Sequence, residues 1–306
     1  MTDDVPVWLR GRTHRERQGE RTLPWMLLLV LLYAVCYALI KPGLAFAPPL
    51  GFAGARALIG GVALLAWATV RGKGVLPRPG GWGDVALLAI PGTTVAFAAM
   101  FLAASRTGTG VAWVLGNMQP LVAVGLAAVF LGERLTFAKI AALALGVAGV
   151  VLLALPSLGG FTAGDATGPA LALAVSLGSG VSTVLVKKRA IGFDLLAITA
   201  WQLIAGAIPL LSASAAFEAA TPIRWTFEFS LLLLFLALAG TALATAVWFR
   251  LVRREEVGRL SMFFFLVPLF GVGIGTLVLR ESFGLPQLAG GVLIVAAVGA
   301  AASNQR

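Results

Sequence analysis

Two prolines interrupt long apolar segments of this sequence where a membrane-spanning helix would otherwise be continuous. Pro120 and Pro268 each lie near the middle of an apolar run long enough to cross a bilayer. A proline inside a helix has no backbone N–H to donate, and its ring clashes with the carbonyl four residues earlier. That carbonyl, here of Gly116 or Phe264, is left without its helical hydrogen bond. Such a carbonyl is tolerated at membrane depth where it is buried in protein or faces a wet cavity. The prolines therefore predict paired kinks beside a ligand site at the midplane, with purely structural kinks as the alternative.

Trp113 and Asn117 stand just before Pro120 and, being four residues apart, share one face of a helix. An aromatic plane and an amide on the same face suit a small amphipathic ligand. Packing is the competing interpretation, because tryptophan often anchors a helix at the membrane interface and asparagine often joins neighbouring helices. Both residues are candidates for ligand binding.

Further aromatic and hydroxyl side chains recur at helical spacing within the apolar runs. Tyr33 and Tyr37 share a face of the first run. Aromatic rings in a membrane also serve as core or lipid contacts, and hydroxyls often bond to their own backbone. The other candidates of this kind are Trp248, Phe264, Phe265, Ser179 and Thr183, and the same ambiguity applies to Thr93, Thr241, Ser182 and Gln202.

Arg56 is the only charged residue clearly inside an apolar run. A cation at the centre of the bilayer costs about 2.5–3.5 kcal/mol on insertion scales, so an intramembrane arginine is a functional candidate by default. It could bind the carboxylate of a ligand. It could equally reach toward the outer headgroups or cap carbonyls of a neighbouring helix. The sequence leaves these alternatives open.

Acidic groups are missing from the places where membrane proteins relay protons. No Asp or Glu lies in the middle third of any apolar run, and the one histidine, His14, is in the N-terminal tail. There is also no HExxH motif and no intramembrane pair of aspartates, which argues against an intramembrane enzyme. We expect no catalytic residues, no metal ion, no cofactor, and transport of a solute without proton or sodium coupling. A channel is the main alternative from another class.

The elements that must position these residues are membrane helices. The chain has 306 residues, of which 59% are hydrophobic and 12% charged, a composition typical of neither soluble nor disordered proteins. Continuous apolar runs predict helices, because barrel strands would be shorter and would alternate in polarity. We therefore expect an all-α integral membrane protein with ten transmembrane helices, over residues 25–40, 51–70, 84–104, 108–131, 137–155, 168–188, 194–214, 227–250, 257–279 and 285–302.

The basic residues indicate how these helices are oriented. If the N-terminus lies in the cytoplasm, 18 of the 23 Lys and Arg residues fall on the cytoplasmic side, as the positive-inside rule requires. We therefore expect both termini in the cytoplasm and a multi-pass protein of a bacterial inner membrane. The net charge of +10 lies in short loops, which favours topology signals over nucleic-acid binding. The expected partners are the lipid bilayer and a small-molecule substrate; we expect a monomer, with an oligomer as the alternative.

The sequence repeats itself after 148 residues, so that residues 88–137 align with 236–285 without a gap. Coincidence of proline, glycine and charged residues at one offset is improbable by chance. Because each half holds five helices, the second half enters the membrane from the opposite side, and inverted halves of this kind support alternating access. The informative pairs are Gly92/Gly240, Thr93/Thr241, Phe101/Phe249, Arg106/Arg254, Gly110/Gly258, Pro120/Pro268, Gly125/Gly273 and Glu133/Glu281.

Three segments resemble EamA-type permeases of the drug/metabolite transporter superfamily: PPLGFAGARALIGGVALL (48–65), FLGERLTFAKIAALALGVAGVVLLA (130–154) and LVPLFGVGIGTLVLRESFGLPQLAGGVLI (266–294). The resemblance implies ten helices with paired cytoplasmic termini and a transporter that exports small metabolites. It is closest in look to bacterial exporters of amino acids, including aromatic ones. Drugs, nucleobases or other metabolites are the alternative substrates.

Together these observations divide the chain into five parts. We expect a basic cytoplasmic tail at residues 1–24 and a first EamA-like five-helix repeat at 25–155. A linker outside the cytoplasm follows at 156–167, then a second EamA-like five-helix repeat at 168–302 and a short cytoplasmic tail at 303–306.

Overall fold

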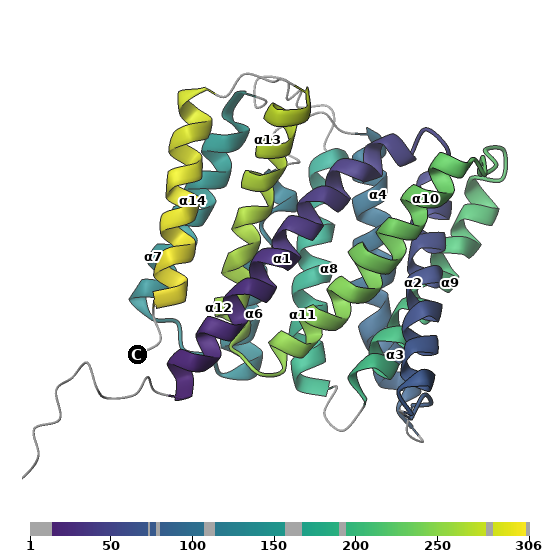
Figure 1. Cartoon of the computed structure of the whole chain (residues 1–306), viewed down its shortest axis with the longest axis horizontal. Coiled ribbons are helices and arrows are strands. Elements are labelled where there is room, and N and C mark those ends of the chain that lie inside the picture. Colours follow the sequence, from purple (N-terminus) through teal and green to yellow (C-terminus); the bar gives the residue numbers. More distant parts are fainter. Residues whose placement is uncertain are drawn as a thin grey trace, which may run out of the picture.

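The computed structural model of the chain describes residues 14–72, 74–77, 80–106, 114–156, 167–189, 194–279 and 284–303. All regular structure in these ranges is helical, and ten helices are long and apolar enough to cross a membrane (Figure 1). This confirms the predicted fold class. The predicted spans agree with these helices to within a few residues, although positions 108–113 of the fourth span lie outside the described residues.

Polar caps and turns set several of the helix boundaries. The Thr136 hydroxyl accepts a hydrogen bond from the backbone N–H of Lys139 (3.3 Å), and the Asp194 carboxylate accepts one from Leu196 (3.0 Å). The first half comprises α1 (His14–Gly43), α2 (Pro49–Val70), α3 (Trp82–Ala89), η2 (Ile90–Val95), α4 (Ala96–Arg106), α6 (Gln119–Leu131) and α7 (Phe137–Ala154). The second half comprises α8 (Thr167–Arg189), α9 (Leu195–Phe217), α10 (Phe227–Ala237), η4 (Leu238–Leu243), α11 (Ala244–Val252), α12 (Val257–Met262), η5 (Phe263–Phe265), α13 (Leu266–Leu279) and α14 (Leu285–Ser303).

The two halves are inverted with respect to each other. In Figure 1, α1 and α8, the first helices of the two halves, run in opposite directions. Helix α1 begins, and α14 ends, at the same end of the bundle, which we call the terminal face. Which side of the membrane this face occupies is still a prediction from the distribution of basic residues.

The repeat is visible in an uncommon local feature. The third and eighth spans each contain a π-helical turn, η2 and η4, and the two turns are 148 positions apart. A π-helical turn is wider than an α-helical one and is frequent at functional sites. In each half it contains a glycine followed by a threonine, Gly92 and Thr93 in η2 and Gly240 and Thr241 in η4.

Helices α2 and α9 pack against each other and carry a second repeat relation, with an offset of 146 residues. Gly60 of α2 lies against the junction of α10 and η4, where an added Cβ would stand 2.9 Å from the carbonyl oxygen of Ala237 and 3.3 Å from the side chain of Thr241. Gly206 of α9 lies against the junction of α3 and η2, where an added Cβ would stand 3.1 Å from the carbonyl oxygen of Ala89 and would overlap the side chain of Thr93. Only glycine fits these two close approaches, through which each half packs on the π-helical turn of the other.

At each end of the bundle, a glutamate of one half caps the start of a helix that belongs to the other half. At the terminal face, the Glu133 carboxylate accepts hydrogen bonds from the backbone N–H groups of Val257 (2.7 Å) and Gly258 (2.9 Å) and lies 3.4 Å from Lys187 Nζ. Two backbone N–H groups and one lysine thus compensate a carboxylate that stands at the end of α6, where the helix dipole disfavours it. At the opposite end, the Glu218 carboxylate accepts from the N–H groups of Leu50 and Gly51 (both 3.0 Å).

Candidate functional site

A cavity of about 130 Å³ lies in the middle of the bundle. By the same measure one water needs roughly 10–15 Å³, so the cavity holds a small organic molecule. Most of the candidates predicted from the sequence line it: Tyr33, Tyr37, Arg56, Gly116, Asn117, Pro120, Ser179, Thr183, Trp248 and Phe264. Trp113 lies outside the described residues.

The lining follows the internal repeat. Eighteen of the 24 lining residues form nine pairs whose members are 146 or 148 positions apart. The cavity therefore lies on the pseudo-two-fold axis that relates the two halves, between equivalent parts of both. The pairs are Tyr33/Ser179, Cys36/Ser182, Tyr37/Thr183, Arg56/Gln202, Gly92/Gly240, Phe97/Thr245, Met100/Trp248, Gly116/Phe264 and Gln119/Val267.

The helix that contains Pro120 is broken rather than kinked. Residues 114–116 are helical, Asn117 forms a turn, and α6 begins at Gln119 with Pro120 in its first turn, where the missing N–H is harmless. The Ser176 hydroxyl of α8 donates to the carbonyl oxygens of Leu115 (2.7 Å) and Gly116 (3.1 Å). The predicted exposed carbonyl of Gly116 is thus satisfied by the protein.

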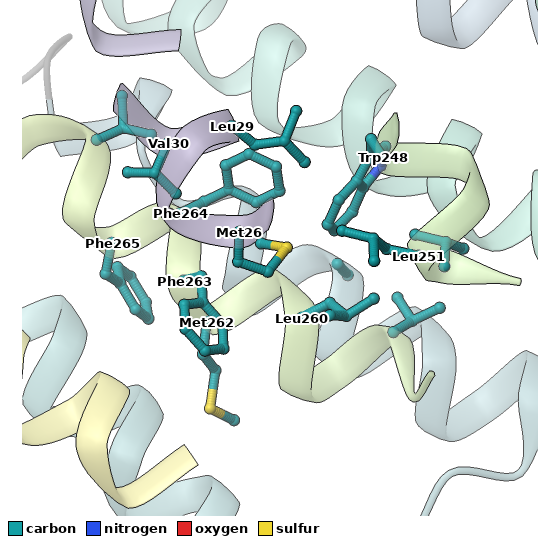
Figure 2. Close-up of a cluster of buried hydrophobic side chains, with 14 of the residues drawn as sticks. Met26, Leu29, Val30, Trp248, Leu251, Leu260, Met262, Phe263, Phe264 and Phe265 are labelled. Atoms are coloured by element: carbon teal, nitrogen blue, oxygen red, sulfur yellow. The ribbon is translucent and has the colours of Figure 1, made fainter. Parts of the chain in front are cut away.

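The corresponding break in the second half is the 3₁₀ turn η5, directly before α13. The phenylalanines of this turn point in different directions (Figure 2). Phe264 faces the cavity and contacts Trp248 edge-on at 4.7 Å between ring centroids, with Tyr33 at 5.5 Å. Phe265 is fully buried away from the cavity, where its ring fills the space left by Gly146 of α7. Pro268 is also buried and does not line the cavity.

Arg56 is 3% exposed and is held by the second half of the chain. Its Nε donates to the Thr241 hydroxyl (2.6 Å) and its Nη2 to the Gly240 carbonyl (3.2 Å), both in η4. The guanidinium also lies over the rings of Phe97 (5.4 Å) and Phe101 (5.9 Å), which attract a cation. Arg56 therefore caps a neighbouring helix, one of the predicted alternatives, and does not reach toward the headgroups.

The second half supplies hydroxyls and an amide. Gln202 Nε2 donates to the Thr93 hydroxyl (3.4 Å). The Trp248 indole N–H donates to the Thr183 hydroxyl (3.3 Å), which itself donates to the Ser179 carbonyl (2.8 Å). The Thr183 hydroxyl thus satisfies local groups, and both Thr183 and Ser179 line the cavity.

Several lining residues escaped the sequence analysis, among them Cys36, Phe97, Met100, Gln119 and Thr245. Their types carry no specific signal, because single apolar and small polar residues are common in membrane helices. Their positions do carry one. Cys36 is related to the candidate Ser182 at an offset of 146, and Met100 to the candidate Trp248 at an offset of 148, so an alignment of the halves that allowed both offsets would have indicated these two.

The cavity is electrostatically one-sided. Among the described lining residues Arg56 carries the only charge, and none is an Asp or Glu. A cation in a site of low dielectric constant without a counter-ion attracts anionic groups far more strongly than it would in water. The arrangement offers one positive pole, several neutral hydrogen-bonding groups and an aromatic wall.

Comparison with known proteins agrees with this architecture. The sequence profile of the EamA-like transporter family matches residues 21–155 and, a second time, residues 166–302. The uncharacterized transporter YvbV of Bacillus subtilis (strain 168) is 30% identical over 91% of this chain and 90% of its own length. Protein PecM of Dickeya dadantii (strain 3937) is 33% identical over 79% of each chain.

A named relative and a solved structure are also similar to this chain. A Salmonella typhimurium protein named "Probable amino-acid metabolite efflux pump" is 30% identical over 88% of this chain and 91% of its own length. A solved crystal structure superimposes with a TM-score of 0.79 at 23% identity, covering 90% of this chain and 94% of the other. At that identity the structural match concerns the fold alone.

Proposed function

Because the chain belongs to the EamA-like transporter family of the drug/metabolite transporter superfamily, we propose that it exports small amphipathic metabolites by alternating access, with amino acids, including aromatic ones, as its substrates. It is a multi-pass membrane protein and a transporter rather than an enzyme. We further assign it to a bacterial inner membrane, in which the positive-inside rule places both termini in the cytoplasm.

The observation that carries this proposal is the position of the cavity on the axis between the two inverted halves. Two halves with the same fold can exchange conformations, so the open and closed ends of the bundle can be interchanged at little net cost. A cavity on the axis keeps its lining during such an exchange. This geometry favours a carrier over a channel.

The chemistry of the lining supports an amphipathic solute. The edge-on pair of Trp248 and Phe264, extended by Tyr33, offers a wall for an apolar or aromatic group. Arg56 and the neutral polar groups face the same space. The name of the Salmonella relative points to the same substrate class.

Transport without ion coupling is part of the proposal. A proton- or sodium-coupled carrier normally places an acidic group at its site, and no carboxylate lines the cavity within the described ranges. The solute would then move down its own gradient or in exchange for another.

Counterflow in proteoliposomes tests the proposed function. Vesicles loaded with unlabelled phenylalanine should transiently accumulate labelled phenylalanine, because the unlabelled solute occupies the carrier inside and blocks the exit of label, whereas a channel cannot concentrate the label. A pH gradient imposed across the membrane should not change the rate. If accumulation requires that gradient, the uncoupled mechanism is wrong; if label only equilibrates, the protein is a channel.

Asn117→Ala serves as the site variant in this assay, since Asn117 lies in the helix break and lines the cavity. We expect a changed apparent affinity for at least one amino acid. Gly125→Ala is the matched control, because an added Cβ there meets no atom within 4 Å. Equal rates for both variants across a panel of amino acids and nucleobases would mean that the solute does not bind in this cavity.

A further inference from the structure

Two buried side chains that line the cavity each leave one polar atom without a hydrogen-bond partner among the described residues. These atoms are Arg56 Nη1 and Gln202 Oε1, on side chains whose residues are 3% and 2% exposed. An unsatisfied buried polar group costs about 1–3 kcal/mol, and more when it is charged. The protein leaves the bonding capacity of both atoms unused. Both residues line the cavity while the two atoms themselves are buried, so a molecule in the cavity would satisfy them after a small shift of each side chain.

The two residues are equivalent in the repeat. Arg56 stands four positions before Gly60, and Gln202 stands four positions before Gly206, the two glycines that pack against the π-helical turns. The contacts of the two side chains match as well. Arg56 bonds to Thr241 of η4, and Gln202 bonds to Thr93, the repeat-related residue of η2.

The small residues next to Arg56 and Gln202 are also related by the repeat. Gly240 faces Cys36 and Arg56, whereas Gly92 faces Ser182 and Gln202. Cys36 and Ser182 are themselves a repeat-related pair. We call the first group, Cys36, Arg56, Gly240 and Thr241, the arginine corner, and the second group, Ser182, Gln202, Gly92 and Thr93, the glutamine corner.

The corners share a scaffold and differ in chemistry. The bonds to Thr241 and Gly240 and the contacts with Phe97 restrain the guanidinium, so that its remaining nitrogen presents a cationic donor. The bond to Thr93 restrains the Gln202 amide, so that its oxygen presents a neutral acceptor. A donor that carries a positive charge pairs best with a carboxylate, and an acceptor of this kind pairs with an ammonium group.

We propose that the arginine and glutamine corners are the two poles of a site for a zwitterion. The solute's carboxylate accepts a hydrogen bond from Arg56 Nη1, and its ammonium group donates one to Gln202 Oε1. The remainder of the solute lies along the wall formed by Trp248 and Phe264. This assignment rests on the proposed function and narrows it to solutes that carry both groups.

Three probes of similar shape test the assignment by counterflow: L-phenylalanine, 2-phenylethylamine, which lacks the carboxylate, and 3-phenylpropionate, which lacks the ammonium group. In the unaltered protein phenylalanine should be favoured over each analogue by about tenfold or more, since a site built to bond a group rejects molecules that lack it. Arg56→Gln should remove the preference over 2-phenylethylamine. Gln202→Leu should remove the preference over 3-phenylpropionate and leave the other preference in place.

The outcomes separate the proposal from the function on which it rests. Equal transport of all three probes by the unaltered protein would overturn the zwitterion site while leaving transport intact. Transport of phenylalanine and 3-phenylpropionate alike would leave Arg56 as a site for anions and overturn the role of Gln202. No counterflow with any probe would contradict the proposed function as well.

A binding measurement guards against variants that fold poorly. Phenylalanine should raise the melting temperature of the purified protein in detergent, and this shift should shrink in both variants while Gly125→Ala and Gly273→Ala retain it. Both control glycines have no atom within 4 Å of an added Cβ. A folded Arg56→Gln variant that keeps the full shift would overturn the assignment of the carboxylate pole.

Discussion

The arginine corner and the glutamine corner occupy equivalent places in two halves of one chain, yet only part of their sequence is the same. The residues that pack the halves together, Gly60 and Gly206 on one side and Thr241 and Thr93 on the other, are identical. The residues whose side chains face the cavity have diverged from each other, as Arg56 and Gln202 show. An inverted repeat needs equivalent joints to exchange conformations, whereas a ligand without two-fold symmetry needs unlike contacts.

Exchanging the two polar residues should give the largest effect. In the double variant Arg56→Gln, Gln202→Arg, the guanidinium would extend into the same cavity from the equivalent position in the other half. If charge-assisted bonds of about 1.5–3 kcal/mol set the preference for a carboxylate, Arg56→Gln alone loses roughly tenfold to hundredfold in that preference. The double variant should recover a large part of it, measured by competition between phenylalanine and 2-phenylethylamine.

The single variant is the control for this exchange. A double variant that folds and still shows no preference for the carboxylate would mean that the two corners are not interchangeable, and that the arginine corner has features beyond its charge.

Adding a methyl group at Gly60 or Gly206, the two glycines through which the halves pack closely, should reduce the stability of the fold. Gly206→Ala and Gly60→Ala each add a methyl group where a backbone carbonyl stands within 3.1 Å and 2.9 Å, respectively, and overpacking of this kind costs about 1–3 kcal/mol. Gly206→Ala should be the more harmful, because its methyl group also overlaps Thr93, whose Cβ cannot move without its backbone. Thermal unfolding in detergent measures the melting temperatures of both variants, with Gly125→Ala as the neutral reference. If all three variants melt at the same temperature, the packing at Gly60 and Gly206 is not close enough to exclude a methyl group.

Removing the threonine hydroxyl from each corner should lower the stability of the fold by different amounts. Thr241→Val deprives a buried guanidinium of its 2.6 Å acceptor, whereas Thr93→Val removes a 3.4 Å bond from a neutral amide. Bonds to charged groups contribute about 1.5–3 kcal/mol and neutral ones about 0.5–1.5 kcal/mol, so Thr241→Val should lower the melting temperature more. A double-mutant cycle with Arg56→Met would isolate the pair energy, and a coupling near zero would contradict this ranking.

The smallest effect concerns a charge pair at the terminal face that has no charged counterpart in the repeat. Lys139 Nζ lies 2.8 Å from Glu256, and the residue repeat-related to Lys139 is the neutral Gln287. The hydrogen bond from Lys139 lowers the pKa of Glu256 below its ordinary value. The pair therefore stabilises the fold at pH values above the ordinary pKa, and this contribution disappears as the pH falls through the lowered one.

Because Glu256 is largely exposed, the loss should amount to about 1 °C or less in melting temperature. Scanning fluorimetry of the unaltered protein and of Glu256→Gln over this acidic range measures it. The variant should show a flatter dependence on pH; two parallel curves would show that the pair contributes nothing.

The sequence predicted the scaffold better than the site. Long apolar runs fix membrane helices almost by themselves, because lipid leaves the backbone few alternatives. A kink was predicted at Pro120, and the helix is interrupted just before it, at Asn117. The direction of neighbouring side chains was not predictable. Phe264 and Phe265 are adjacent and of the same type, but the 3₁₀ turn that contains them directs only Phe264 to the cavity.

Gln202 shows a second limit. Its equivalence to Arg56 is hidden from an alignment at a single offset, since the chain between Gly206 and η4 is two residues longer than that between Gly60 and η2. The partner of Arg56, Thr241, likewise lies 185 positions away in a π-helical turn. Residue types alone indicate neither the turn nor the contact.

The lone guanidinium in the cavity also bears on how the protein responds to voltage. A zwitterion has no net charge, so binding it leaves the total charge of the site unchanged. Moving one elementary charge through 100 mV is worth about 2.3 kcal/mol, and a carrier that gained or lost charge with its cargo would be driven or held back by the membrane potential. With a zwitterion between its corners, the loaded and the empty protein carry the same single positive charge among the described lining residues. The gradient of the solute would then drive net flux without help from the electrical potential of the cell.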